Sequence, residues 1–185
     1  ILFYYLCSMK KITTILLLLV SLISFSQEYY RDTIIERAVF EKVNEYRLSV
    51  GVHALAFNSD NYRAVQWGEV LVNNDLSTGG SIYHCGCSAG SENIAKTNVG
   101  DENEVIMSVD EIATKLLQLW IDSDSHRKGM ENTNMTRGFN SVYVYKSNVS
   151  DGKYAAISVY QFLRDKEYYI ELDWDENERV PKRVL

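Results

Sequence analysis

FNSVYVY at residues 139–145 and KYAAISVYQFL at residues 153–163 are rich in β-branched and aromatic residues, which favour strands. Ser150-Asp151-Gly152, between the two segments, is typical of a turn. The two segments therefore predict an antiparallel hairpin. A further strand is expected over residues 168–174, where side chains of alternating character line two faces.

The residues before this hairpin have helical rather than strand periodicity. Residues 33–49 carry apolar side chains at helical spacing, and Thr33 and Glu36 have the spacing of a capping box. Similar patterns predict helices over about 60–75 and from Ser108 to about Asp122. Helices followed by an antiparallel meander predict an α+β fold.

Residues 76–104 are rich in glycine, serine, asparagine and aspartate, and we expect them to form a long irregular region. Long loops in compact domains are usually functional or stapled. This region contains YHCGCSAGSENIA (83–95), which brings a histidine, two cysteines and a glutamate close together in sequence.

The first 26 residues have the pattern of an export signal. Met9-Lys10-Lys11 gives a basic start, and an uncharged apolar run of twelve residues follows, ending in small residues. We expect residues 1–26 to be upstream residues plus a secretory signal peptide, too short to be a good membrane span. The expected organisation is then a domain over 27–165 and a C-terminal strand with a charged tail over 166–185. A protein of this kind is expected outside the cell or in the periplasm of a bacterium.

The composition suits one globular domain that is not a nucleic-acid binder. Hydrophobic residues make up 46% of the chain, and the formal net charge is −6. Loss of residues 1–26 removes two lysines and no acids, which leaves −8. Because the chain has no basic stripe or Lys/Arg-rich run, we expect no nucleic-acid partner.

Three separated stretches together resemble the CAP superfamily, which includes cysteine-rich secretory proteins, wasp-venom antigens, plant pathogenesis-related proteins and bacterial secreted domains. The resemblance runs from about residue 33 to 163. It rests on Asn44-x-x-Arg47, on His84 followed by Gly90-Ser91-Glu92-Asn93-Ile94, and on Trp120-x-x-Ser123-x-x-His126. The resemblance implies a three-layer α-β-α sandwich with a small antiparallel sheet and a surface cleft.

The same resemblance implies that His84, Glu92 and His126 converge in the cleft, with Asn93 and Ser123 beside them. Ser123 stands where many members of the family have a second glutamate. His84 and His126 would be the ligands of a divalent cation, zinc in the first place, because neutral imidazoles bind it well. The spacing of the residues alone leaves another interpretation open, in which both histidines are hydrogen-bonded side chains that brace the loop.

Cys85 and Cys87 have three interpretations in an oxidising compartment. The first is a disulfide across Gly86, with only a small entropic stabilisation because the loop is short. The second is a pair of thiolates that join the histidines around zinc. The third is a redox-active pair, which a Cys-x-Cys spacing supports less than Cys-x-x-Cys would.

We therefore expect a secreted binding or interaction module rather than an enzyme. Its cleft would take an unknown protein, lipid or small-molecule ligand. The alternative is a metal-dependent hydrolase, protease-like or directed at the cell wall, with Glu92 as general base. The sequence contains no serine-nucleophile motif, no H-E-x-x-H and no P-loop.

Overall fold

The computed structural model describes residues 29–59, 62–86, 90–101, 106–147, 153–164, 173–174 and 181–182. The expected signal peptide over 1–26 lies outside these residues, as do Cys87 and most of the tail. Within the described part of the chain, no helix has both the length and the apolar character needed to cross a bilayer.

The described residues form a mixed set of helices and strands. In chain order these are β1 (Tyr29–Arg31), α2 (Thr33–Ser49), β2 (Ala56–Phe57), α3 (Tyr62–Thr78), β3 (Ser91–Asp101), α4 (Val109–Ile121), α5 (Asp124–Met130), β4 (Arg137–Lys146), β5 (Lys153–Leu163), β6 (Asp173–Trp174) and β7 (Pro181–Lys182).

The main sheet has the strand order β1-β4-β5-β3, and its neighbouring strands are antiparallel. The predicted hairpin is confirmed as β4–β5, with Ser141 opposite Val159. The short strand β2 joins β4 in parallel beyond the end of β1, where Ala56 pairs with Arg137. The strand β3 is the last in this order, so one of its sides is an edge of the sheet.

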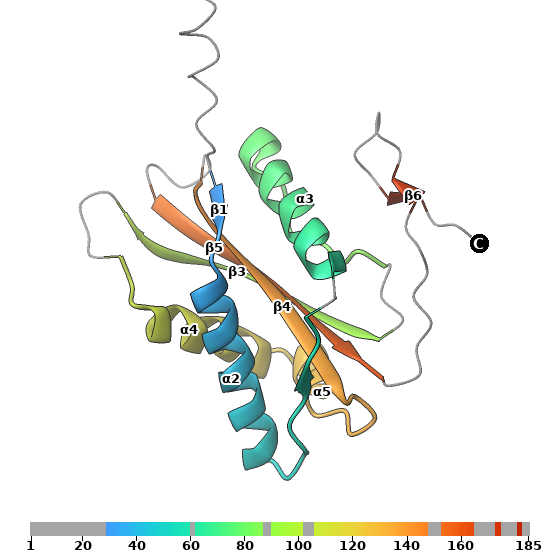
Figure 1. Cartoon of the computed structure of the whole chain (residues 1–185). Coiled ribbons are helices and arrows are strands. Elements are labelled where there is room, and N and C mark those ends of the chain that lie inside the picture. The colour runs from blue at the N-terminus through green and yellow to red at the C-terminus, as the bar shows by residue number, and fades with distance from the viewer. Residues whose placement is uncertain are drawn as a thin grey trace, which may run out of the picture.

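Helices cover both faces of the sheet, which confirms the predicted α-β-α sandwich (Figure 1). On one face, Trp67 and Leu71 of α3 pack in a cluster with Tyr143 and Ile157 of the hairpin. On the other face, α2 and α4 pack against residues such as Val142. The two clusters use alternate residues of the same strands, because successive side chains of a strand point to opposite faces.

The expectation of a long irregular region over 76–104 is wrong at both ends, although residues 79–86 form neither helix nor strand. The helix α3 continues to Thr78, and residues 91–101 form the strand β3, which pairs with β5 along its length. The sequence SENIAKTNVGD does not indicate a strand, because its polar and apolar residues do not alternate as they do in a half-buried strand. Pairing with β5, which is remote in sequence, makes it a strand.

The N-terminus of α2 also differs from the prediction. The cap is Asp32 rather than Thr33, and its carboxylate accepts hydrogen bonds from the backbone N–H groups of Ile34 and Ile35 at 3.0 Å. Glu36 is engaged elsewhere: it accepts two hydrogen bonds from Arg31, at 2.6 and 2.9 Å. The capping box predicted further along, at Ser108 and Glu111 at the start of α4, is confirmed.

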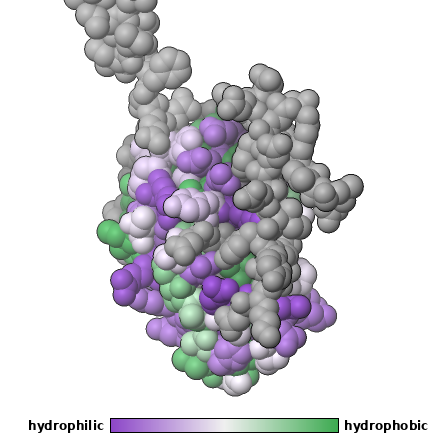
Figure 2. Space-filling model, turned by 45° about the vertical axis from the view of Figure 1, so that its right-hand side comes forward, coloured by the Kyte–Doolittle hydropathy of each residue, from purple (hydrophilic) through white to green (hydrophobic). Residues whose placement is uncertain are grey.

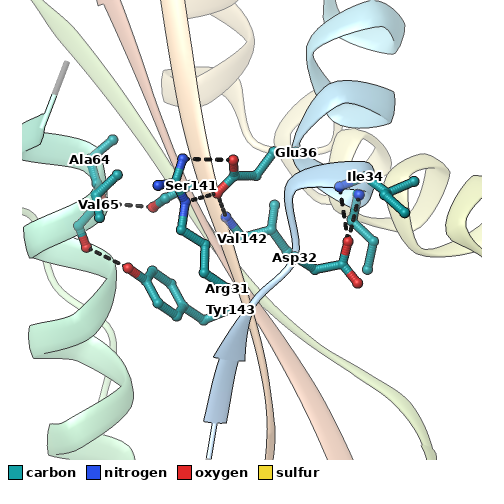
Figure 3. A network of polar contacts seen from close by, with 10 residues as sticks. Arg31, Asp32, Ile34, Glu36, Ala64, Val65, Ser141, Val142 and Tyr143 are labelled. Carbon is teal, nitrogen blue, oxygen red and sulfur yellow. Dashed lines mark hydrogen bonds and ion pairs between the residues drawn. The ribbon is translucent and has the colours of Figure 1, made fainter. Parts of the chain in front are cut away.

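The polar network in Figure 3 ties β1, α2 and α3 to β4. Besides its bonds to Arg31, Glu36 accepts a hydrogen bond from the backbone N–H of Val142 at 3.1 Å. On the α3 side, the Ser141 hydroxyl donates to the carbonyl oxygen of Ala64 at 2.5 Å. The edge of β4 that pairs with β1 and β2 is thus also bonded to the Glu36 side chain, at Val142 between the two paired stretches.

The C-terminal residues that the structure describes form a separate two-stranded sheet. Asp173 pairs with Lys182 and Trp174 with Pro181. The rest of the strand predicted over 168–174 lies outside the described residues.

Large exposed hydrophobic side chains are spread over several elements: Tyr30, Ile34, Leu48, Val50, Phe57, Tyr62, Tyr83, Ile106 and Leu119. On the face shown in Figure 2, hydrophobic residues lie among hydrophilic ones.

Candidate functional site

The structure brings together two histidines that are far apart in sequence. His84 lies in the segment between α3 and β3, and His126 lies in α5. Their ring centroids are 5.8 Å apart, with an angle of 57° between the ring planes. The two imidazoles are therefore neighbours beside the first residues of the edge strand β3.

Glu92, at the start of β3, holds His84. Its Oε1 lies 3.1 Å from His84 Nδ1 and accepts a hydrogen bond from the backbone N–H of Cys85, also at 3.1 Å. The other carboxylate oxygen accepts from Gln161 Nε2 at 3.3 Å. The Glu92 side chain is only 6% exposed, whereas that of His84 is 56% exposed. The buried carboxylate thus fixes one edge of an imidazole that is more than half exposed.

Gln161 is a site residue that the sequence did not reveal. It lies in β5 directly opposite Glu92 in the β3–β5 register. Side chains of directly opposed residues lie close together on one face of a sheet. Only the register of the two strands could have identified it, and that register is not readable from either segment alone.

Asn93 holds the helix that carries His126. Its Nδ2 donates to the backbone carbonyl of His126 at 3.0 Å, and the side chain is almost fully buried. The same helix lies tight against β3 at Gly129, where an added Cβ would be 2.6 Å from Ser91 Oγ. The position of His126 therefore depends on how closely α5 sits on the edge strand.

Ser123 lies at the N-cap of α5, but its side chain makes no capping hydrogen bond. Its hydroxyl lies 3.2 Å from that of Ser125. Ser123 thus lies in the helix start that carries His126, and its hydrogen bond stays within that turn.

The two residues of the first motif, Asn44 and Arg47, both form hydrogen bonds to backbone groups. The Asn44 side chain exchanges two hydrogen bonds with the backbone of Leu55, at 2.8 and 3.1 Å. Arg47 is fully buried and donates to the carbonyl oxygens of His53, Met130 and Met135. The guanidinium therefore joins α2 to the end of α5 and the segment after it, which makes its role structural.

Burial and the neighbouring His84 lower the pKa of His126. Transfer of an imidazole from water into the protein disfavours its charged form, and a second imidazole beside it adds to the effect. The lowered pKa favours the neutral form of His126, which is the form in which an imidazole binds a metal ion.

Among the described residues, His84 and His126 are the side chains that could hold a metal ion at this place, with Glu92 as a supporting carboxylate. If His84 donates its Nδ1–H to Glu92, its Nε2 is left free, an arrangement typical of metal-ligating histidines. Among the residues described, no cluster of three or more His, Cys, Asp or Glu side chains is arranged to hold an ion. None of the described residues adds a third protein ligand to His84 and His126, so the other ligands of an ion held there would come from elsewhere.

Cys85 is half-buried beside the α3 cluster, and its backbone is tied to Glu92. It is disulfide-bonded, and the other two cysteines, Cys7 and Cys87, lie outside the described residues. The pairing of Cys85 with Cys87 therefore stays a prediction.

No protein-family model matches the sequence, and no curated protein matches it. Among solved structures, an outer surface protein from Borrelia burgdorferi is similar with a TM-score of 0.43 and 14% identity, over 74% of this chain and 98% of that one. A cysteine-rich secretory protein from Staphylococcus aureus is similar with a TM-score of 0.33 and 17% identity. That match covers 68% of this chain but only 38% of the other. Similarities this weak establish neither a family nor a function for this chain.

Proposed function

We propose that this chain is an exported, CAP-like binding module whose cleft, formed by His84, Glu92 and His126, holds a divalent cation and a ligand upon it. The observation that carries this proposal is the pair of neighbouring imidazoles of His84 and His126, whose ring centroids are 5.8 Å apart. The His84 ring also contacts the buried carboxylate of Glu92. The resemblance of three sequence stretches to the CAP superfamily and the α-β-α fold both support it. The ligand would be a protein, a lipid or a small molecule outside the cell.

The chemistry of the two histidines suits zinc, which takes imidazole nitrogens readily. Glu92 contacts His84 at Nδ1, and burial lowers the pKa of His126, which favours its neutral form. A bound zinc ion would supply a Lewis-acid position for an oxygen or nitrogen atom of the ligand. The two imidazoles would fill two coordination positions of the ion and leave others for water and for that ligand.

Calorimetric titration of the purified protein with zinc tests the proposal. We expect one ion per chain for the wild type and loss of this binding in the His84→Ala, His126→Ala double variant. The chain offers a matched control in its third histidine, His53, whose Nε2 lies 2.9 Å from the carbonyl oxygen of Met135. His53→Ala should bind zinc as the wild type does. Equal zinc uptake by the double variant and the wild type would exclude His84 and His126 as the zinc ligands.

A metal-dependent hydrolase with Glu92 as general base is the second candidate. Its supporting observation is that a buried carboxylate lies directly beside a potential metal ligand. However, both carboxylate oxygens already accept hydrogen bonds from Cys85 and Gln161, which favours positioning over proton transfer. Zinc-dependent turnover of a peptide, ester or cell-wall fragment that Glu92→Gln abolishes even at zinc concentrations that saturate the variant would favour the hydrolase.

A further inference from the structure

A row of polar side chains crosses the sheet on the face covered by α2, α4 and α5. Tyr160 of β5 lies between Asn93 of β3 and Asn140 of β4, directly opposite both. Asn93 is 1% exposed, and Asn140 and Tyr160 are 0% exposed. Ser158, also fully buried, lies two residues before Tyr160 on the same face. We call these four residues the polar row.

The polar row is surrounded by apolar and aromatic groups. The ring of Tyr160 contacts those of Phe40, Trp120 and Phe162, at centroid distances of 6.4, 5.8 and 4.5 Å. Its hydroxyl lies over the backbone of β4, since a Cβ at Gly138 would be only 2.8 Å from it. The row is therefore enclosed in the largest hydrophobic cluster of the domain rather than at its surface.

Polar atoms of this row find no hydrogen-bond partner among the described protein atoms. They are Asn93 Oδ1, both side-chain polar atoms of Asn140, Ser158 Oγ and the Tyr160 hydroxyl. Buried polar side-chain atoms in native proteins are nearly always hydrogen-bonded, to protein or to ordered water. Five such atoms on one face of a sheet call for a partner from outside the chain.

The opposite face of the same strands shows the contrast (Figure 3). There the Ser141 hydroxyl donates to Ala64 O at 2.5 Å, and the Tyr143 hydroxyl donates to Val65 O at 3.1 Å. Ser141 and Tyr143 are as deeply buried as Ser158 and Tyr160. The backbone of α3 satisfies the hydroxyls on one face, whereas the helices over the polar row leave those of Ser158 and Tyr160 unsatisfied.

We propose that the polar row is an internal hydration site, in which ordered water molecules bind Asn140, Ser158 and Tyr160. The groups without a hydrogen-bond partner include both donors and acceptors, and all of them belong to neutral side chains. To satisfy all of them, a bound molecule must both donate and accept hydrogen bonds. Buried waters meet this description, because they typically make about three hydrogen bonds to such groups.

Burial raises the pKa of Tyr160, so its hydroxyl stays protonated and keeps its capacity to donate. Asn93 extends the row to the cleft, because its Nδ2 donates to His126 O while its Oδ1 is unpaired. The hydration site thus lies next to the contact that positions α5, but it does not depend on metal binding at the cleft.

Oxygen-17 relaxation dispersion of the purified protein tests the proposal, because it counts water molecules that are held longer than the protein tumbles. Tyr160→Phe and Ser158→Ala each remove one hydroxyl of the row. Tyr143→Phe and Ser141→Ala are matched controls on the other face. We expect each row variant to lose dispersion amplitude equivalent to about one water molecule, while both controls keep the wild-type amplitude. Unchanged amplitude in the row variants, or an equal loss in the controls, would overturn the proposal.

If a row variant does not fold, a crystal structure of the wild-type protein can still test the proposal. Solvent density within hydrogen-bond reach of the Asn140 amide and the Tyr160 hydroxyl would support the hydration site. Density in which Asn140, Ser158 and Tyr160 bond only to protein atoms would exclude it.

Discussion

Glu92 and Asn93 are consecutive residues of β3, and they hold the two histidines from opposite faces of the sheet. Glu92 contacts Nδ1 of His84, and Asn93 donates to the backbone carbonyl of His126. Successive side chains of a strand alternate in direction, so a single strand can reach both covering layers. Because β3 is the last strand of the sheet, residues from the layers on its two faces can approach each other past its edge. The ring centroids of the two histidines are 5.8 Å apart there.

This relationship predicts that Glu92→Gln weakens zinc binding without unfolding the protein. The amide oxygen can still accept hydrogen bonds, but the side chain no longer offers a charged partner to His84 Nδ1–H. Loss of such a supporting partner typically lowers metal affinity roughly 10- to 100-fold. Calorimetric titration measures the change. Glu41→Gln, which alters an exposed carboxylate paired with Arg37, should bind zinc with wild-type affinity.

Gly129→Ala should both destabilise the protein and disturb His126. The added Cβ would lie 2.6 Å from Ser91 Oγ and 3.2 Å from Asn93 Oδ1, so either these side chains or α5 must shift. Overpacking of this kind costs about 1–3 kcal/mol of unfolding free energy, measurable by denaturant titration. Adding Ser91→Ala removes the nearest clashing atom and should recover part of the loss. If the double variant is no more stable than Gly129→Ala alone, the contact is not the cause.

Arg47→Met should be among the most destabilising single substitutions in the chain. It removes a buried guanidinium that donates to several backbone carbonyls and leaves those carbonyls without their donor. Hydrogen bonds to charged groups contribute about 1.5–3 kcal/mol each, so we expect a loss above ~2 kcal/mol in denaturant titration. The control Arg37→Met changes an exposed arginine paired with Glu41, and should stay within about 0.5 kcal/mol of the wild type.

His126 should make stability depend on pH in the absence of metal. Its folded-state pKa lies below the ordinary value of 6.5, so the unfolded chain takes up the proton more readily. This contribution to stability is fully present above pH 6.5 and is lost as the pH falls through and below that value. Melting temperatures at about pH 7.5 and about pH 5.5, with a chelator present, measure it. His126→Ala should melt with a smaller difference between the two pH values than the wild type, and an equal difference would contradict the assignment.

Sequence patterns predicted the elements whose signals are local. The helix α2 begins and ends where its apolar periodicity does, and α4 begins at the capping box of Ser108. The β4–β5 hairpin follows from two strand-like segments close in sequence. The strand β3 was missed because its residues become a strand only by pairing with β5, and the cap of α2 was misplaced because Asp32 competed with Thr33 for it.

The sequence by itself determined the helices and the hairpin, because periodicity and caps are local features of the chain, and its resemblance to the CAP superfamily pointed to His84, Glu92 and His126. Only the tertiary structure decided which atoms meet. The bond from Gln161 to Glu92 depends on a strand register, and the contact of Asn93 with α5 depends on helix packing. Both pairings join residues remote in sequence, and their geometry follows from the packing of a sheet edge between two helical layers.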